Sequence, residues 1–176
     1  ILRINRKLQF SLTELKTVEE AMEHMAMHDP LTNLPSRRLL DDRMHQALTV
    51  AKRNNTQVAL MYLDLNQFKP VNDSFGHAVG DQLLQQTAVR LVECVRESDT
   101  VARIGGDEFI VLLRTVADVS DACAVAEKIH TALGLPFELV AHRLSISCSI
   151  GIAIYPLHGS DSLELFQRAD TAMYQA

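Results

Sequence analysis

The sequence predicts an α/β (α+β) domain in which helices flank one central sheet. Residues 58–63 form an unbroken run without charge, which is typical of a central strand buried on both faces. The stretch 101–113 places Gly105-Gly106 between two mostly apolar segments, which is typical of a β-hairpin. Segments with helical apolar spacing alternate with these strands, so helices are expected to cover the sheet.

The segment 1–27 is expected to form a separate signalling helix, because its apolar residues repeat every seven positions. The first set of seam residues is Ile1, Leu8, Leu15 and Met22, and the second is Ile4, Val18 and Met25, with Ser11 breaking the pattern. This seam favours a parallel two-stranded coiled coil, and the alternative is one amphipathic helix packed on its own domain. Because the chain begins with isoleucine, we expect a fragment from which an upstream sensory or membrane region has been removed.

The next elements follow from apolar spacing and end signals. A helix is expected to begin after Ser36 as N-cap and to end at Asn54-Asn55. Its apolar face comprises Leu40, Met44, Ala47, Leu48 and Ala51. After the strand at 58–63, a polar loop is expected to extend to Gly80. The helix after that loop has an inner face of Leu84, Ala88, Leu91, Val92 and Val95, and residues 96–99 close it.

Four further elements are expected after the hairpin. They are a helix at 119–133, two strands at 143–149 and 150–155, and a final helix from about Ser162. Strands and helices thus alternate around one sheet, without an internal repeat or a low-complexity tract.

The composition is typical of one domain with a sizeable core, since 47% of the 176 residues are hydrophobic. No run approaches the roughly 20 apolar residues of a membrane helix and no signal-peptide pattern opens the chain, so a cytoplasmic protein is expected. The three cysteines are scattered, which favours buried thiols over a zinc site or a disulfide. The net charge of −5 argues against a nucleic-acid partner.

Three carboxylates are candidates for a metal site. Asp107 and Glu108 follow the two glycines of the hairpin, and Asp64 follows the buried strand. If that strand lies beside the hairpin, Asp64 and Asp107 can converge on one Mg²⁺ ion, which prefers carboxylate oxygens together with substrate phosphates. The alternative is an ordinary hairpin whose acids are only solvated.

Three segments together strongly resemble the GGDEF family of diguanylate cyclases. They are 64–73 (Asp-Leu-Asn-Gln-Phe-Lys-Pro-Val-Asn-Asp), 75–81 (Phe-Gly-His-Ala-Val-Gly-Asp) and 103–109 (Arg-Ile-Gly-Gly-Asp-Glu-Phe). The resemblance implies a family domain at 28–176, truncated at its C-terminal end, with 1–27 outside it. It also implies a ferredoxin-like palm with a roughly five-stranded, mainly antiparallel sheet, similar to that of nucleotidyl cyclases.

The implied activity is the condensation of two GTP molecules into cyclic di-GMP and two pyrophosphates. A 3′-hydroxyl attacks an α-phosphate in this reaction, so the main demands are charge neutralisation and alignment. The resemblance implies Mg²⁺ or Mn²⁺ as cofactor and a homodimer in which each domain holds one GTP. The alternative is a non-catalytic module that binds GTP or cyclic di-GMP and controls an attached phosphodiesterase or sensor partner.

The same resemblance implies roles for individual residues. The metal ligands would be Asp64, Asp107, Glu108 and the main-chain carbonyl of Leu65. The catalytic residues would be Asp107, Glu108 and Lys69, with Glu108 binding metal or activating the hydroxyl and Lys69 holding the terminal phosphates. The GTP-binding residues would be Phe68, Lys69, Asn72, Asp81 and Arg103. Taken without the family, Asp81 is a helix N-cap and Asn72 a turn residue.

Arg96 and Asp99 match the family's inhibitory product site. An arginine can bind guanine O6 and N7 while an acid takes the Watson–Crick donors, and the alternative is a surface pair at a helix end. Three residues depart from the family pattern, namely Ser36, Asn66 and Pro70. The chain also stops at Ala176, where the family continues with a lysine and a Gly-Arg-Asn segment, so this fragment is expected to be weaker than its parent.

Overall fold

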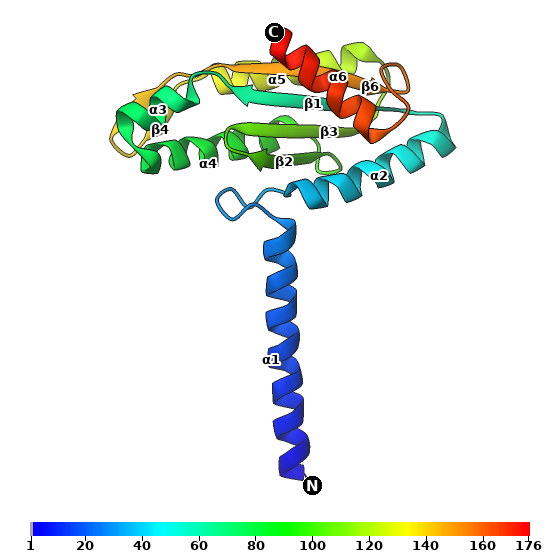
Figure 1. Ribbon diagram of the computed structural model, residues 1–176, viewed down its shortest axis with the longest axis vertical. Helices are drawn as coiled ribbons and strands as arrows, with labels where there is room; N and C mark the ends of the chain where they lie inside the picture. The colour runs from blue at the N-terminus through cyan, green and yellow to red at the C-terminus, as the bar shows by residue number, and fades with distance from the viewer. Residues whose placement is uncertain (1) are drawn as a thin grey trace.

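The computed structural model describes residues 2–176, with the backbone alone described for 2–12 and 20. Helix α1 (Leu2–Met27) extends away from the rest of the chain as one long helix, and the remaining elements pack into a single domain (Figure 1). The domain contains α2 (Arg37–Asn54), β1 (Gln57–Leu65), α3 (Phe68–Phe75), α4 (His77–Cys94), β2 (Thr100–Gly105), β3 (Glu108–Val116), α5 (Val119–Gly134), β4 (Phe137–Leu139), β5 (His142–Leu144), β6 (Cys148–Tyr155) and α6 (Ser162–Gln175).

The main sheet is antiparallel throughout and has the strand order β2-β3-β1-β6. Strand β1 lies at its centre, between β3 and β6, which explains why the run at 58–63 is apolar on both faces. The predicted fold class, an α+β domain with a mainly antiparallel sheet flanked by helices, is confirmed. The main sheet has four strands, however, and β4 and β5 form a separate two-stranded sheet.

Each face of the sheet has its own apolar core. Alternate β1 residues, including Met61 and Leu63, pack with α3, α4 and α5, whereas Leu60 and Tyr62 pack with α2 and α6. Figure 1 shows α6 crossing the sheet over β1 and β6. Because successive strand residues point to opposite faces, Asp64 shares the α2/α6 face with Tyr62.

The segment after β1 differs from the prediction of a polar loop. It forms two helices, α3 and α4, separated only by Gly76. Phe68 and Val71 are buried on one side of α3, and Pro70 fits because it lies in the first turn, where a backbone N–H has no helical partner. Asp81 therefore lies inside α4, and its predicted role as N-cap is wrong because the helix begins at His77.

Two other boundaries differ in detail. Ser36 is the N-cap of α2 as predicted, but its hydroxyl donates to the carbonyl oxygen of Ala26 at 3.3 Å instead of capping the helix. Asn55 ends α2 in the left-handed conformation, as the Asn54-Asn55 signal predicted. The predicted strand at 143–149 is wrong, because only His142–Leu144 pairs with β4 and the next strand begins at Cys148.

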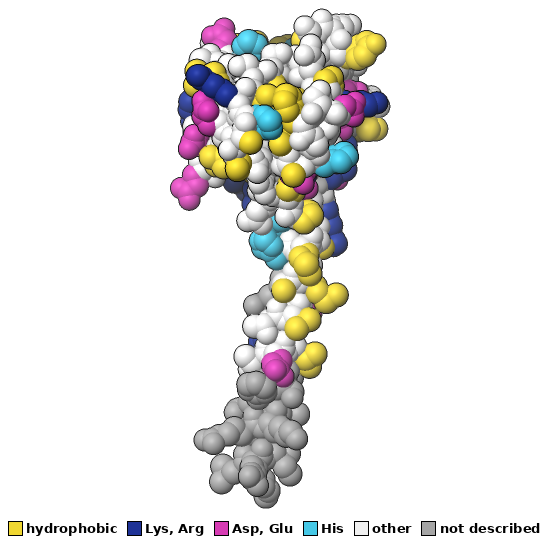
Figure 2. Space-filling model, turned by 90° about the vertical axis from the view of Figure 1, so that its left-hand side faces the viewer, with side chains coloured by type: hydrophobic (Ala, Val, Ile, Leu, Met, Phe, Trp, Pro, Cys, Tyr) yellow, Lys and Arg dark blue, Asp and Glu magenta, His cyan; other side chains and the backbone are white. Residues whose placement is uncertain are grey.

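The apolar seam of α1 is exposed where its side chains are described. Leu15, Val18, Met22 and Met25 are between 57% and 68% exposed, and Figure 2 shows hydrophobic side chains along this part of the helix. Ile1 and the side chains of Ile4, Leu8 and Ser11 lie outside the described residues. Among the described residues, no helix is both long and apolar enough to cross a membrane. The coiled coil stays a prediction.

Candidate active site

The turn between β2 and β3 carries two of the acids and is braced by Arg103. Gly106 has a φ of +40°, a conformation that glycine reaches without steric cost. Its carbonyl oxygen accepts hydrogen bonds from Nε and Nη2 of Arg103 at 3.0 and 2.7 Å. Nη1 of Arg103 lies 3.0 Å from each carboxylate oxygen of Asp29. One guanidinium therefore ties the acidic turn to the loop that follows α1.

The Arg103–Asp29 pair is largely shielded from solvent, with 12% and 16% of the two side chains exposed. Burial raises the pKa of Asp29, but hydrogen bonds from Thr32 and the contact with Arg103 lower this pKa overall, so Asp29 is held as a carboxylate. Arg103 was predicted to bind GTP. The structure places it beneath the turn, with all three guanidinium nitrogen atoms bound to protein oxygens.

The strand β1 brings a third acid to the turn. Asp64 is the direct cross-strand partner of Glu108 on β3, so their side chains leave the same face of the sheet at neighbouring positions. The adjacency on which the predicted metal site depends is therefore present. Glu108 has a protein partner of its own, because the hydroxyl of Tyr62 donates to its Oε1 at 3.0 Å.

The electrostatics at the end of β1 and the adjacent acidic turn, which together form the acidic edge of the sheet, favour a cation. Burial, together with the negative charges of Asp107 and Glu108, raises the pKa of Asp64 to about 6. Burial and the hydrogen bond to Glu108 likewise raise the pKa of Tyr62 to about 12, so its proton is available for donation at neutral pH. A divalent cation would relieve the repulsion among the three carboxylates.

The oxygen donors at this edge suit Mg²⁺ or Mn²⁺, which prefer hard oxygen ligands. Asp64, Asp107 and the main-chain carbonyl of Leu65 are the groups that could hold such an ion. Within the part of the chain that the structure describes, no three acidic, histidine or cysteine side chains are already clustered around one metal position. The bond from Tyr62 holds one oxygen of Glu108, so substrate phosphates would have to complete the coordination.

The predicted guanine-binding residues lie on the two helices after β1. Asn72 is on α3 and Asp81 is exposed on α4. Oδ1 of Asn72 is buried and has no hydrogen-bond partner among the described residues. It lies against Gly80, where a side chain would collide with it. An unpaired buried acceptor of this kind requires a donor, and guanine offers N–H donors at N1 and N2.

The other two predicted GTP contacts are differently placed. Lys69 is exposed at the start of α3, where its ammonium group is free to meet a phosphate. Phe68 is only 9% exposed and packs in the apolar core at the start of α3. The structure therefore gives Phe68 a supporting position in the core beside α3 and α4.

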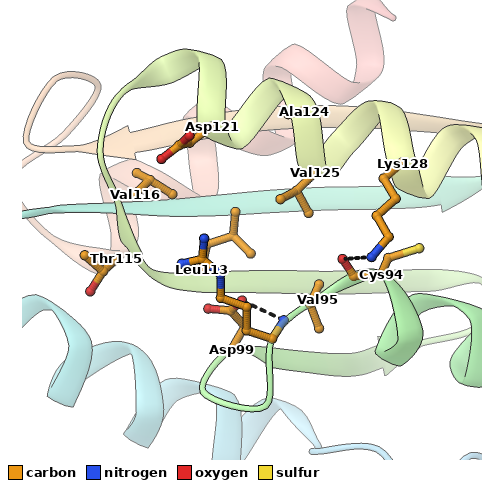
Figure 3. Close-up of a pocket in the computed structure, with 11 residues that line it drawn as sticks. Cys94, Val95, Asp99, Leu113, Thr115, Val116, Asp121, Ala124, Val125 and Lys128 are labelled. Carbon is orange, nitrogen blue, oxygen red and sulfur yellow. Dashed lines mark hydrogen bonds between the residues drawn. The ribbon is translucent and has the colours of Figure 1, made fainter.

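The predicted product-site residues line a separate cavity of about 350 Å³ between β3, α5 and the segment after α4 (Figure 3). The Asp99 carboxylate accepts hydrogen bonds from the backbone N–H groups of Arg96 and Arg114 at 3.0 and 3.2 Å. Arg96 and Asp99 are therefore joined through the Arg96 backbone, which leaves the guanidinium outside this bond. Lys128 also lines the cavity, while its Nζ donates to the Cys94 carbonyl.

Two functional candidates escaped sequence reasoning. Tyr62 was counted as one apolar residue of the central strand, although its position two residues before Asp64 places both on one face. Asp29 lies outside the three segments that resemble the family, and its partner Arg103 lies 74 residues further along the chain. No local pattern could have predicted that ion pair.

Comparison with known proteins adds independent findings. A family profile described as "Diguanylate cyclase, GGDEF domain" matches residues 26–176. The chain is 42% identical over 174 residues to MucR of Pseudomonas aeruginosa, a bifunctional diguanylate cyclase/cyclic di-GMP phosphodiesterase. That alignment covers 99% of this chain and 25% of MucR, so the chain spans a quarter of that relative.

Two solved structures resemble this fold closely. The GGDEF domain of TpbB from Pseudomonas aeruginosa superimposes with a TM-score of 0.83 at 43% identity, covering 85% of this chain and 87% of that one. The coiled coil and GGDEF domain of DgcB from Caulobacter crescentus, in complex with c-di-GMP, gives a TM-score of 0.83 at 26% identity. It covers 97% of this chain and 92% of the DgcB chain.

Proposed function

The chain belongs to the GGDEF-domain family, and on that premise we propose that it is a diguanylate cyclase that condenses two GTP molecules into cyclic di-GMP. The single observation that carries the proposal is the pairing of Asp64 with Glu108 beside the Gly105-Gly106 turn. This pairing concentrates carboxylates at one sheet edge and raises the pKa of Asp64. Such a set of oxygens suits a divalent ion that carries a triphosphate.

The proposed chemistry divides among the residues of this edge. Mg²⁺ or Mn²⁺, when bound by Asp64, Asp107 and the Leu65 carbonyl, supplies charge neutralisation at the phosphates. The exposed Lys69 holds the terminal phosphates from the start of α3. Glu108 keeps its Oε2 available, since Oε1 accepts from Tyr62, and this oxygen either contacts metal or receives the proton of the attacking 3′-hydroxyl.

Recognition of guanine is proposed for α3 and α4. The buried, unpaired Oδ1 of Asn72 can accept from a guanine N–H, and Asp81 can accept from another. Arg103 then acts beside the nucleotide by keeping the turn that carries Asp107 in place through Asp29 and the Gly106 carbonyl. Use of GTP as substrate is consistent with a domain that works in the cytoplasm.

One domain offers one set of nucleotide-binding groups, so joining two GTP molecules requires two chains facing each other. The exposed apolar seam of α1 supports a parallel pairing that brings two domains together. We propose that the homodimer forms through this helix.

The cavity lined by Arg96 and Asp99 is the proposed inhibitory site for cyclic di-GMP. The Arg96 guanidinium makes no hydrogen bond to Asp99, so it can pair with guanine O6 and N7. Because the cavity opens beside β3, product bound there would lie close to the strand that carries Glu108.

The proposal is tested by incubating the chain with GTP and Mg²⁺ and separating the products. Cyclic di-GMP and pyrophosphate are expected, turnover per chain should rise with protein concentration, and Asp107→Ala should abolish the product while retaining the wild-type melting temperature. Titration calorimetry with GTP and with cyclic di-GMP distinguishes the alternative. Tight binding of either nucleotide without any turnover would identify a regulatory module instead, and the name of MucR includes a phosphodiesterase activity beside the cyclase activity.

A further inference from the structure

The hydroxyl of Tyr62 contacts a proposed catalytic residue, Glu108, but has no role of its own in the proposed reaction. Tyr62 sits two residues before Asp64 on the α2/α6 face of β1, and the residue is only 8% exposed. Its hydroxyl donates to Oε1 of Glu108 at 3.0 Å, diagonally across to β3. Among the three acids at this edge, Glu108 is the one whose carboxylate accepts a hydrogen bond from a described side chain.

The surrounding backbone restricts where the Tyr62 ring can go. Its cross-strand neighbour on β6 is Gly151. A side chain at Gly151 would collide with main-chain atoms of Ala169 and Met173, so α6 lies directly on the sheet there. The Tyr62 ring is thus enclosed between α6 and β3. This packing holds its hydroxyl within hydrogen-bond distance of the Glu108 carboxylate.

The bond divides the two oxygens of Glu108. Oε1 is committed to Tyr62, whereas Oε2 lies on the side of Gly105, 3.9 Å from where a Cβ of that residue would be. This hydrogen bond fixes the orientation of the carboxylate, while Oε2 accepts no hydrogen bond from a described residue. Within the described residues, no three acidic, histidine or cysteine side chains form a ready metal-binding cluster at this position.

We propose that Tyr62 is a positioning residue that holds Oε1 of Glu108 toward its own hydroxyl and away from the cation position beside Asp64. The inference deepens the proposed function and rests on it. With Glu108 held back, the ion is left to Asp64, Asp107 and the nucleotide, and the remaining oxygen of Glu108 is kept for the reacting end of the substrate. A hydrogen bond to a carboxylate is stronger than one between neutral groups, so it biases the orientation of Glu108.

The test is Tyr62→Phe, which removes only the hydroxyl and keeps the ring. The matched control is Tyr155→Phe, because Tyr155 is half-buried on the same face of the sheet but lies opposite Val58, at the far end of β1. We expect kcat for cyclic di-GMP formation to fall about tenfold in Tyr62→Phe while KM for GTP stays within about twofold. Tyr155→Phe is expected to match wild type in both constants.

A second readout does not depend on turnover. Mn²⁺ binding is measured by electron paramagnetic resonance with a non-hydrolysable GTP analogue. In Tyr62→Phe the released Glu108 can reach the ion, so Mn²⁺ should bind at least about threefold more tightly. In a Glu108→Gln background, Tyr62→Phe should change neither Mn²⁺ affinity nor kcat by more than about twofold, because the two residues act through one bond.

The outcomes separate this inference from the proposed function. Failure of the wild-type chain to make cyclic di-GMP would overturn the proposed function, and the Mn²⁺ titrations would still report on Tyr62. If the wild type is active, an unchanged kcat or an unchanged Mn²⁺ affinity in Tyr62→Phe would overturn the positioning role. An undiminished effect of Tyr62→Phe in the Glu108→Gln background would overturn it equally, since the hydroxyl would then act on another group.

Discussion

Asp64 lowers the stability of the folded domain but contributes a carboxylate to the candidate metal site. It is half-buried beside Asp107 and Glu108, and burial together with their charges raises its pKa to about 6. Folding therefore brings three carboxylates closer together than they lie in the unfolded chain. Natural domains retain such repulsion where a bound cation offsets it.

The pH dependence of stability tests this cost at Asp64. Its folded pKa of about 6 exceeds the ordinary value of 3.8, so between these values the native state binds more protons and stability falls as pH rises. Asp64→Asn should raise the free energy of unfolding near neutral pH by about 1 kcal/mol in EDTA, after allowance for solvent screening. Near pH 4 the same variant should match wild type.

Urea unfolding at both pH values measures this difference. Asp42→Asn on α2 is the control, because Asp42 is exposed and outside the acidic edge. Equal effects of the two variants, or a destabilised Asp64→Asn near neutral pH, would contradict the electrostatic account. Added Mg²⁺ should stabilise wild type and have less effect on Asp64→Asn.

Arg96 gives a second prediction at the scale of a single residue, because it lines the cavity between β3 and α5. Its guanidinium lines the space beside β3, while Asp99 is held by backbone N–H groups. Arg96→Ala should raise the concentration of cyclic di-GMP needed for half inhibition by about tenfold or more, since a charge-assisted bidentate contact is lost. Arg143→Ala, on β5 outside the cavity, should leave inhibition unchanged. Equal inhibition of both variants would reject the site.

At the scale of elements, local sequence patterns predicted the strands and helices whose formation depends on residues close together in the sequence. The apolar run of β1 and the two glycines of the hairpin each predicted an element, whereas the pairing of these two elements was left open by the sequence and is observed in the structure. Helix α3 was missed because eight residues contain only two turns of apolar spacing. Residues 143–147 alternate like a strand, yet they lack a continuous partner, and pairing is what a sequence pattern cannot supply.

The contact between α6 and β6 gives a prediction at the element scale. Gly151 leaves room for main-chain atoms of Ala169 and Met173, which cannot move aside as a flexible side chain could. Gly151→Ala should therefore destabilise the domain by about 2–3 kcal/mol, because α6 must shift from the sheet. Gly134→Ala is the matched control, since nothing lies within 4 Å of the added Cβ at the end of α5. Thermal melts compare them, and equal stability of the two variants would contradict this packing.

In the whole molecule, the loop after α1 joins this long helix to the GGDEF-family domain. The backbone N–H of Ser36 donates to the Met27 carbonyl at 2.8 Å, which closes the intervening loop against the end of α1. Asp29 lies in that loop and pairs with Arg103, which in turn holds the Gly106 carbonyl. A continuous series of bonds therefore connects the end of α1 to the acidic turn, so a movement of α1 could be transmitted to that turn. This link joins distant segments, so it could not be predicted from local sequence.

Assembly through α1 is the prediction at this largest scale. Met22 occupies the heptad seam and is 62% exposed, so a charge there should oppose helix pairing. Met22→Glu should weaken the dimer at least about tenfold in sedimentation equilibrium and lower turnover per chain at low protein concentration. Thr17→Glu adds the same charge to an exposed position off the seam and should behave as wild type. Loss of pairing in both variants, or in neither, would show that the seam of α1 does not hold the two domains together.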